Sequence, residues 1–184
     1  MPGCTLSTLH QPADGELVLF KDATQIQARV QALGITLARS HATKRPVVVG
    51  LLSGAFVFMA DLVRAMDIPC EVDFWRLSSY GVGRNSTGEI TEPVQLETDV
   101  HGRHVIVVED IVDTGATLAH VRAELARKTP ASVTVVALLR SRKSSVHVDH
   151  VGFESGDHFV VGYGLDLAYA FRNLPDLYYH VVDT

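Results

Sequence analysis

The sequence predicts an α/β protein with a central, mostly parallel sheet flanked by helices. Short apolar runs typical of buried strands alternate along the chain with longer segments whose apolar residues have helical spacing. Strands that alternate with helices pair in parallel and place helices over both faces of the sheet. The 184 residues, 47% of them hydrophobic, can bury such a core and favour a single domain over residues 1–184.

The first half of the chain predicts two helices and two strands after an irregular lead-in at residues 1–19. Apolar side chains recur at helical spacing between Ile26 and Leu37, and Asp22 or Thr24 could cap this helix. The predicted elements, in order, are a helix, a strand, a helix and a strand over residues 21–40, 47–52, 55–66 and 69–77.

The second half begins with residues 80–93, whose Gly, Ser, Thr and Asn content predicts a long loop. A strand, a helix, a strand and a short strand are predicted after it, over residues 105–108, 118–128, 133–139 and 159–162. Ligands of open α/β sheets bind beyond the carboxyl ends of the strands. Ser53, Glu109 and the start of the loop all fall at that edge, so we expect the functional site there.

Composition and charge exclude several classes of protein. The net charge of −5 comes from scattered acids and bases, which argues against nonspecific nucleic-acid binding because that needs a basic face. Cys4 and Cys70 are too few for a disulfide framework. No secretory signal is visible, and no apolar run approaches the roughly 20 residues that cross a bilayer. We expect a reduced, cytoplasmic protein that binds neither nucleic acid nor membranes.

An acidic turn around residue 113 is the most informative local pattern. Glu109 and Asp110 end a buried strand, and a third acid opens the run Asp113-Thr114-Gly115-Ala116-Thr117, which leads into a helix. Free amides at a helix start bind phosphate, and Gly lets the backbone approach a ligand closely. Acids repel a phosphate unless it belongs to a sugar whose hydroxyls or metal ion they hold. The alternative is a strand that ends in solvated acids, with Asp113 capping the helix.

The pattern of residues 109–117 resembles the phosphoribosyl-pyrophosphate (PRPP) signature of the type I phosphoribosyltransferases. Further stretches resemble the hypoxanthine (or hypoxanthine-guanine) phosphoribosyltransferases, and they follow in order over residues 50–62, 71–74, 78–81, 151–153 and 159–166. The resemblance implies the type I fold, with a core at about residues 21–145. It also implies a small hood for base recognition, built from residues 1–20 and 146–184.

The resemblance implies an enzyme of purine salvage, a magnesium-dependent glycosyltransferase. It would move the 5-phosphoribosyl group of PRPP to N9 of hypoxanthine or guanine, giving IMP or GMP and pyrophosphate. Glu109 and Asp110 would contact the ribose 2′ and 3′ hydroxyls, directly or through Mg²⁺, and Asp113 would accept a proton near the purine N7. The 5′-phosphate would be held by the amides and hydroxyls of Asp113, Thr114, Gly115, Ala116 and Thr117.

Two further segments would complete the PRPP site. The turn Leu52-Ser53-Gly54 would bind pyrophosphate through its amides, although many family members have Lys where this chain has Ser53. Ser79 and Tyr80 would form the hinge of a flexible cover over the sugar. The alternatives are an ordinary strand-to-helix turn capped by Ser53 and a loop that is simply solvated.

The base-binding residues follow the acidic turn in the sequence. The resemblance makes Phe159 the ring that stacks on the purine, with Val160 backbone groups reading the base edge; the alternative for Phe159 is an ordinary core aromatic. It makes Asp166 a second magnesium contact and Arg172 a residue near pyrophosphate, where the alternatives are a loop acid and a surface charge.

The base-binding region also contains the largest departure from the family pattern. The family usually has Lys two residues after the paired leucines, where this chain has Ser141. Lys143, Arg140 or Arg142 could substitute by a local shift.

Two other functions are alternatives to the enzyme. A regulator with the same fold would sense PRPP or nucleotides and bind RNA or DNA through a basic face, for which Arg140, Arg142 and Lys143 are the visible cluster. A phosphoacceptor signalling domain normally has its acidic pair after the first strand, whereas Glu109 and Asp110 lie past mid-chain. The family further implies a homodimer or homotetramer.

Overall fold

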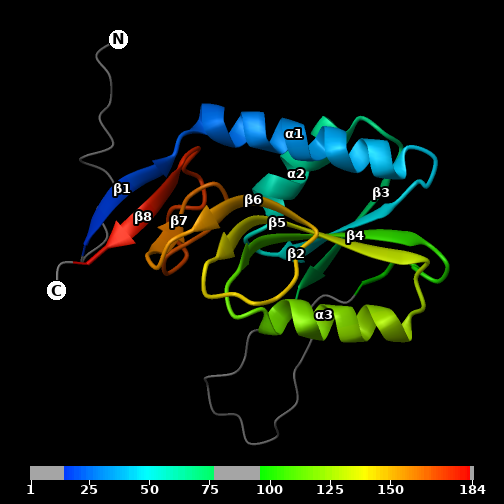
Figure 1. The fold of residues 1–184 in the computed structure, drawn as a ribbon. Helices are drawn as coiled ribbons and strands as arrows, with labels where there is room; N and C mark the ends of the chain where they lie inside the picture. The colour runs from blue at the N-terminus through cyan, green and yellow to red at the C-terminus, as the bar shows by residue number, and fades with distance from the viewer. Residues whose placement is uncertain (1–14, 77–95, 183–184) are drawn as a thin grey trace, which may run out of the picture.

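A computed structural model describes residues 15–76 and 96–182. Within these residues, five parallel strands form the main sheet in the order β3-β2-β4-β5-β6, and three antiparallel strands form a second sheet in the order β1-β8-β7 (Figure 1). The elements are β1 Glu16–Lys21, α1 Ala23–His41, β2 Val47–Leu52, α2 Phe56–Met66, β3 Glu71–Arg76, β4 His104–Val112, α3 Ala116–Arg127, β5 Ser132–Ser141, β6 His150–Ser155, β7 Phe159–Val161 and β8 Leu177–Val181.

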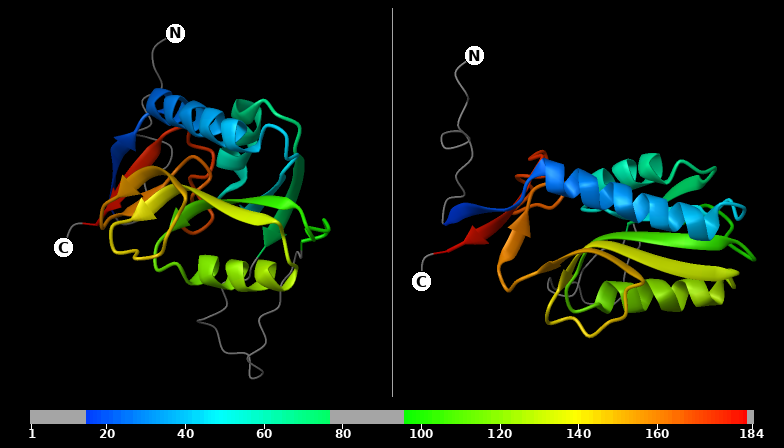
Figure 2. Two further views of the ribbon diagram at one scale, coloured as in Figure 1. Left: turned by 45° about the vertical axis from the view of Figure 1, so that its right-hand side comes forward. Right: turned by 45° about the horizontal axis from the view of Figure 1, so that its top comes forward.

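The main sheet is buried on both faces. Figure 2 shows α1 and α2 on one face and α3 on the other. Alternate residues of neighbouring strands enter the two cores: Val48 and Ile106 pack with α1 and α2, whereas Val47 and Val105 pack with α3. Strands covered on both faces become continuous apolar runs. The predicted α/β class and its parallel sheet are therefore confirmed.

Helix α1 begins where a cap was predicted. The Asp22 side chain accepts a hydrogen bond from the Gln25 amide at 2.8 Å, and the Gln25 side chain accepts one from the Asp22 amide at 3.2 Å. This reciprocal pair satisfies two amides that the helix leaves free. In the described part of the chain, no helix is long and apolar enough to span a membrane.

The second sheet forms a hood at one end of the molecule (Figure 1). Strand β1 pairs with β8, so the N-terminal and C-terminal segments meet, as the expected hood requires. The Phe20 ring stacks on Tyr179 at 4.4 Å between centroids and meets Phe153 of β6 edge-on at 6.5 Å. These aromatic contacts attach the hood to the edge of the main sheet.

Several sequence expectations need correction. Residues 16–19 were expected to be irregular, but they lie in β1, which is defined by pairing with β8 about 160 residues away rather than by a local pattern. Strands β6 and β8 were not predicted. Because β6 joins the main sheet, that sheet extends to Ser155, beyond the core expected to end near residue 145. Ser79, Tyr80 and the predicted loop at 80–93 lie outside the described residues.

Candidate functional site

The site lies at the carboxyl end of the main sheet, and β4 supplies its acids. This strand continues past the four residues predicted for it, since Glu109 pairs with Ala137 and Val112 with Arg140. Glu109 and Asp110 are therefore part of the strand rather than of the turn after it. Adjacent strand residues point to opposite faces, and the two acids accordingly line two different cavities.

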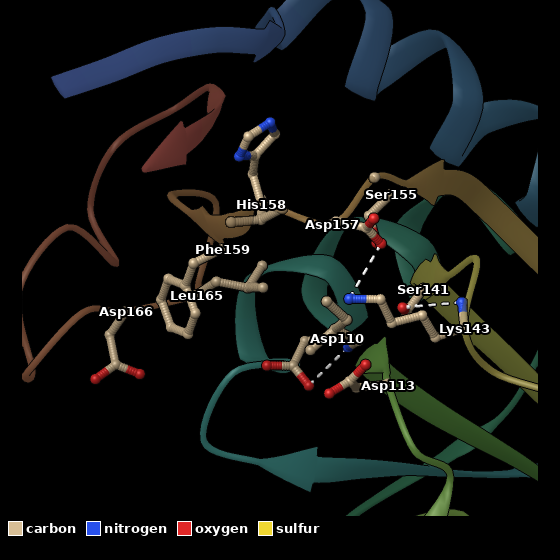
Figure 3. A pocket seen from close by; sticks show the side chains of 13 residues that line it. Asp110, Asp113, Ser141, Lys143, Ser155, Asp157, His158, Phe159, Leu165 and Asp166 are labelled. Carbon is tan, nitrogen blue, oxygen red and sulfur yellow. Dashed lines mark hydrogen bonds and ion pairs between the residues drawn. The ribbon is translucent and has the colours of Figure 1, made fainter. Parts of the chain in front are cut away.

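The larger cavity has a volume of about 430 Å³. Figure 3 shows carboxylates from β4 and the following turn pointing into the same space as an aromatic ring from the hood. The predicted site residues that it brings together are Asp110, Asp113, Lys143, Phe159, Val160 and Asp166. Its volume falls within the range of small-molecule sites, and its lining mixes apolar and charged groups as such sites do.

The smaller cavity, of about 80 Å³, is the turn before α3. It is lined by Glu109, Thr114, Gly115 and Thr117, and it shares Ile111 and Asp113 with the larger cavity. Gly115 is the N-cap with a φ of 80° and makes no side-chain cap hydrogen bond, and among the described residues the Ala116 amide donates to the Thr114 hydroxyl at 3.4 Å rather than to Asp113. The alternative role of Asp113 as a cap is therefore wrong. Uncapped amides at a helix start form an anion-binding site.

Gly115 also permits close packing at this turn. A Cβ atom built on Gly115 would overlap the Val146 side chain, and the positive φ itself favours glycine. The loop between β5 and β6 therefore closes directly over the turn, which fixes the position of the helix amides.

Burial controls the charge of the acidic pair. Glu109 is only 7% exposed, and its Oε2 atom has no hydrogen-bond partner in the parts of the chain that are described. Burial, and then the charge of Asp110, raise the pKa of Glu109 well above its ordinary value. Burial also raises the pKa of Asp110, although its own amide, the Ile111 amide and the charge of Arg172 act in the opposite direction. A cation bound here would lower the pKa of both carboxyl groups.

The described residues alone would not enclose a metal ion. Among the described residues, no group of three or more His, Cys, Asp or Glu side chains is arranged to hold a metal. Glu109, Asp110 and Asp166 therefore do not form a ready-made ligand set. Magnesium suits such a place, since it is commonly bound by one or two carboxylates together with substrate phosphates and water.

The turn between β2 and α2 lies directly against the acidic pair. The Leu52–Ser53 peptide bond is cis, and a Cβ on Gly54 would overlap the Asp110 carboxylate. Helix α2 has Ala55 as its N-cap without a side-chain hydrogen bond, so Ser53 does not cap it. Leu52, Ser53 and Gly54 do not line either of the two cavities described above. Gly54 nevertheless lies against Asp110, which lines the larger cavity, so this turn is adjacent to that cavity.

Arg172 and Asp166 form an ion pair beside the larger cavity. An Arg172 Nη2 atom lies 2.5 Å from Asp166 Oδ1, and Nη1 donates a hydrogen bond to the Gly164 carbonyl at 2.6 Å. Asp166 lines the cavity, whereas Arg172 and Ala116 do not. The Arg172 side chain is partly buried, so its alternative role as a plain surface charge is wrong.

A solvent-exposed aromatic ring lies at the hood end of the cavity. Phe159 is 54% exposed, which excludes the core-aromatic alternative, while the neighbouring Val160 is buried. Lys143 Nζ lies 3.2 Å from Asp157 across the cavity, as Figure 3 shows. Arg140 instead pairs with Glu154 at 2.5 Å, outside the cavity lining. Of the three substitutes considered for the missing family lysine, only Lys143 lines the cavity.

Ser141 occupies the usual lysine position and is only 6% exposed. Its Oγ atom accepts a hydrogen bond from the Lys143 amide at 3.3 Å, which shapes the turn after β5. Sequence reasoning missed Ser141 as a lining residue, and it also missed Ser155, Asp157 and His158. Ser155 ends the unpredicted strand β6, and Asp157 and His158 follow it; the only available signal was a polar run before Phe159.

The fold and the site define a type I phosphoribosyltransferase domain. The phosphoribosyl transferase domain family matches residues 20–168. The hypoxanthine phosphoribosyltransferase of Haemophilus influenzae is 44% identical over 155 residues, covering 81% of this chain and 87% of that protein. The hypoxanthine-guanine phosphoribosyltransferase of Bacillus subtilis is 41% identical over 165 residues, covering 88% of this chain and 91% of that protein.

A solved structure agrees with these relatives. The hypoxanthine-guanine phosphoribosyltransferase of Bacillus anthracis superposes with a TM-score of 0.83 at 34% identity, covering 90% of this chain and 100% of that one. This chain belongs to the hypoxanthine (hypoxanthine-guanine) phosphoribosyltransferase family. The resemblance found in the sequence is therefore confirmed.

The Gly115→Ala substitution tests the close packing of the phosphate turn. We expect it to lower the free energy of unfolding by about 1–3 kcal/mol more than Gly102→Ala, because the added methyl group overlaps Val146. Gly102 is a matched control, since it also has a positive φ but no atom lies within 4 Å of its Cβ position. Denaturant unfolding measures both variants, and equal losses would contradict the packing described here.

Proposed function

We propose that this protein transfers the 5-phosphoribosyl group of PRPP to N9 of hypoxanthine or guanine, with release of pyrophosphate, in purine salvage. One observation carries the proposal: Asp113 lines both the anion-binding turn and the larger cavity. A nucleoside monophosphate spans these two spaces if its phosphate lies at the turn and its base in the cavity. Family membership and the similarity to hypoxanthine and hypoxanthine-guanine phosphoribosyltransferases support the same activity.

The sugar phosphate accounts for the mixture of acids and anion-binding amides. The amides and hydroxyls from Asp113 to Thr117 would hold the 5′-phosphate at the uncapped start of α3. Asp110 and Glu109 would then accept hydrogen bonds from the ribose hydroxyls. The turn at Leu52, Ser53 and Gly54, which touches Asp110, would bind pyrophosphate through its amides, with Arg172 and its partner Asp166 beside it.

Mg²⁺ is the cofactor that this arrangement fits. The buried, unpartnered Oε2 atom of Glu109 and the raised pKa of both neighbouring carboxyls indicate a place where a cation would be stabilised. Bound magnesium would supply positive charge to the departing pyrophosphate. Asp110 and Glu109 would hold it on the sugar side, and Asp166 on the side of Arg172.

The chain's own residues would mainly position the reactants and move one proton. The bond from C1′ to the pyrophosphate oxygen breaks ahead of attack by N9, and positive charge develops on the sugar. Phe159 would stack on the purine and fix its plane, which gives the alignment that such a reaction needs. Asp113 would accept the proton from N7, since it lines both the cavity proposed for the base and the turn proposed for the phosphate.

Lys143 is the proposed contact to the purine 6-oxo group. It replaces the lysine that the family usually has at the position of Ser141, and it is the only Lys or Arg in the lining of the larger cavity as described. Its partner Asp157 orients it from the opposite turn at 3.2 Å. The Val160 backbone would read the adjacent edge of the base.

Ion pairing of the basic cluster favours the enzyme over a nucleic-acid-binding regulator. Arg140 and Lys143 pair with Glu154 and Asp157, so the charge of this cluster is largely neutralised.

Exposed apolar side chains support a homodimer or homotetramer. They lie on the edge strand β3 and at the start of α2, namely Val72, Phe74 and Phe56. The cytoplasmic location stays a prediction.

A base-panel assay tests the activity directly. Purified protein is given PRPP and Mg²⁺ with hypoxanthine, guanine, xanthine, adenine or a pyrimidine, and pyrophosphate release is measured. We expect release with hypoxanthine or guanine, because Lys143 offers a hydrogen-bond donor to a 6-oxo group. Release with adenine alone would contradict the proposed base recognition, and no release with any base would contradict the proposed activity.

The Asp113→Asn substitution tests the proposed base. We expect turnover at saturating substrates to fall by about ten- to a hundredfold, because the amide cannot accept the N7 proton. Asp67→Asn is the matched control, since that exposed residue ends α2 away from both cavities. Steady-state kinetics compares the two variants; if Asp113→Asn turns over like the control, Asp113 is not the proton acceptor.

A further inference from the structure

One buried hydrogen bond lies outside the proposed chemistry and connects two parts of the site. The Tyr163 hydroxyl donates to Asp61 Oδ2 at 2.5 Å, across 102 positions of sequence. Asp61 belongs to α2, and Tyr163 begins the segment that runs from the end of β7 to the ion pair of Asp166 and Arg172. Burial and the Asp61 carboxylate raise the pKa of Tyr163 above its ordinary value, so the hydroxyl stays protonated and remains a donor.

Backbone hydrogen bonds within residues 162–174 hold this segment together. The Tyr163 amide donates to the Leu174 carbonyl at 2.8 Å, and the Gly164 amide donates to the Arg172 carbonyl at 3.0 Å. Gly162, Tyr163 and Gly164 all have positive φ values, a conformation that a tyrosine rarely adopts. The segment therefore has its own internal support, and its side chains Tyr163 and Leu165 pack in the core that also contains residues of α1 and α2.

Two contacts connect this unit to pyrophosphate elements of the proposed site. A Cβ on Gly164 would overlap the Gly54 carbonyl, so the two backbones touch. The Gly164 carbonyl also accepts the hydrogen bond from Arg172 Nη1. A shift of Gly164 would displace both the turn at Gly54 and the guanidinium of Arg172.

The base end of the cavity has separate support. Val160 and Val161 are held in β7 by pairing with Tyr179 and Tyr178 of β8. A loss of the contact at Tyr163 should therefore disturb the pyrophosphate side more than the purine side.

We propose that Tyr163 and Asp61 form a positioning pair that holds residues 162–174 against α2 and thereby aligns Arg172 and Gly54 for the pyrophosphate portion of PRPP. Neither residue lines either cavity of the proposed site. The inference rests on the proposed function for its substrate, while the tether itself is a property of the fold.

Three single variants separate positioning from general stability. Tyr163→Phe removes only the hydroxyl, and Asp61→Asn keeps an oxygen that can accept the bond. Tyr178→Phe is the matched control, because it removes another tyrosine-to-aspartate hydrogen bond, from Tyr178 to Asp176 at 2.9 Å in the hood. We expect Tyr163→Phe to raise the KM for PRPP about three- to tenfold with little change in the KM for the purine.

The other single variants should differ from Tyr163→Phe in their KM for PRPP. Asp61→Asn should stay close to the wild type, and the double variant should be no worse than Tyr163→Phe, because both act on one interaction. Tyr178→Phe should change neither KM, because it removes only the hydroxyl and leaves the backbone pairing of Tyr178 with Val161 in place. Equal increases in both KM values for Tyr163→Phe, or an unchanged KM for PRPP, would overturn the positioning role.

Hydrogen–deuterium exchange supplies a readout that needs no substrate. Amides of residues 162–174 should exchange faster in Tyr163→Phe than in the wild type or in Tyr178→Phe. Unchanged exchange there would overturn the tether. If the wild type releases no pyrophosphate from PRPP, the proposed function fails by itself, and the exchange result still decides whether the tether exists.

Discussion

Two adjacent carboxyl groups at the end of β4 are the constraint on which the site depends. Glu109 is buried and Asp110 is partly buried, and burial raises the pKa of each. Removing charge from water is costly unless partners compensate, and the Glu109 Oε2 atom has no hydrogen-bond partner among the described residues. These acids lie at the edge of the sheet where Arg172, the Gly54 turn and the start of α3 come together. Their burial is therefore unfavourable for the stability of the fold, and a bound cation or sugar would compensate for it.

The parallel sheet explains why residues from distant segments meet there. Strands β2, β4, β5 and β6 run parallel, so their carboxyl ends supply the turn at Gly54, the acidic pair, the turn at Lys143 and the turn at Asp157 to one edge. The hood adds Phe159 and Val160 from the side. Asp113 lies between the anion-binding turn and the base cavity, which is the position that a proton acceptor shared by sugar phosphate and purine would need.

Local patterns predicted the elements whose signals are local. Strand β2 was predicted with its observed bounds, and α1 and α2 were predicted within one or two residues at each end. Their signals, apolar periodicity and the Asp22 cap, come from residues that are close together in the sequence. Strands β1 and β8 depend on pairing with each other across the chain, which no local pattern reports. In the site, the acidic turn was predictable from its residue types, whereas the pairing of Lys143 with Asp157 and of Tyr163 with Asp61 required the fold.

The most direct test of the central claim is a crystal structure of the protein with IMP or GMP. The account predicts that the nucleotide phosphate lies on the amides of residues 114–117, with the ribose diol at Glu109 and Asp110 and the purine against Phe159. A nucleotide bound elsewhere, or one whose phosphate is turned away from the start of α3, would contradict the account.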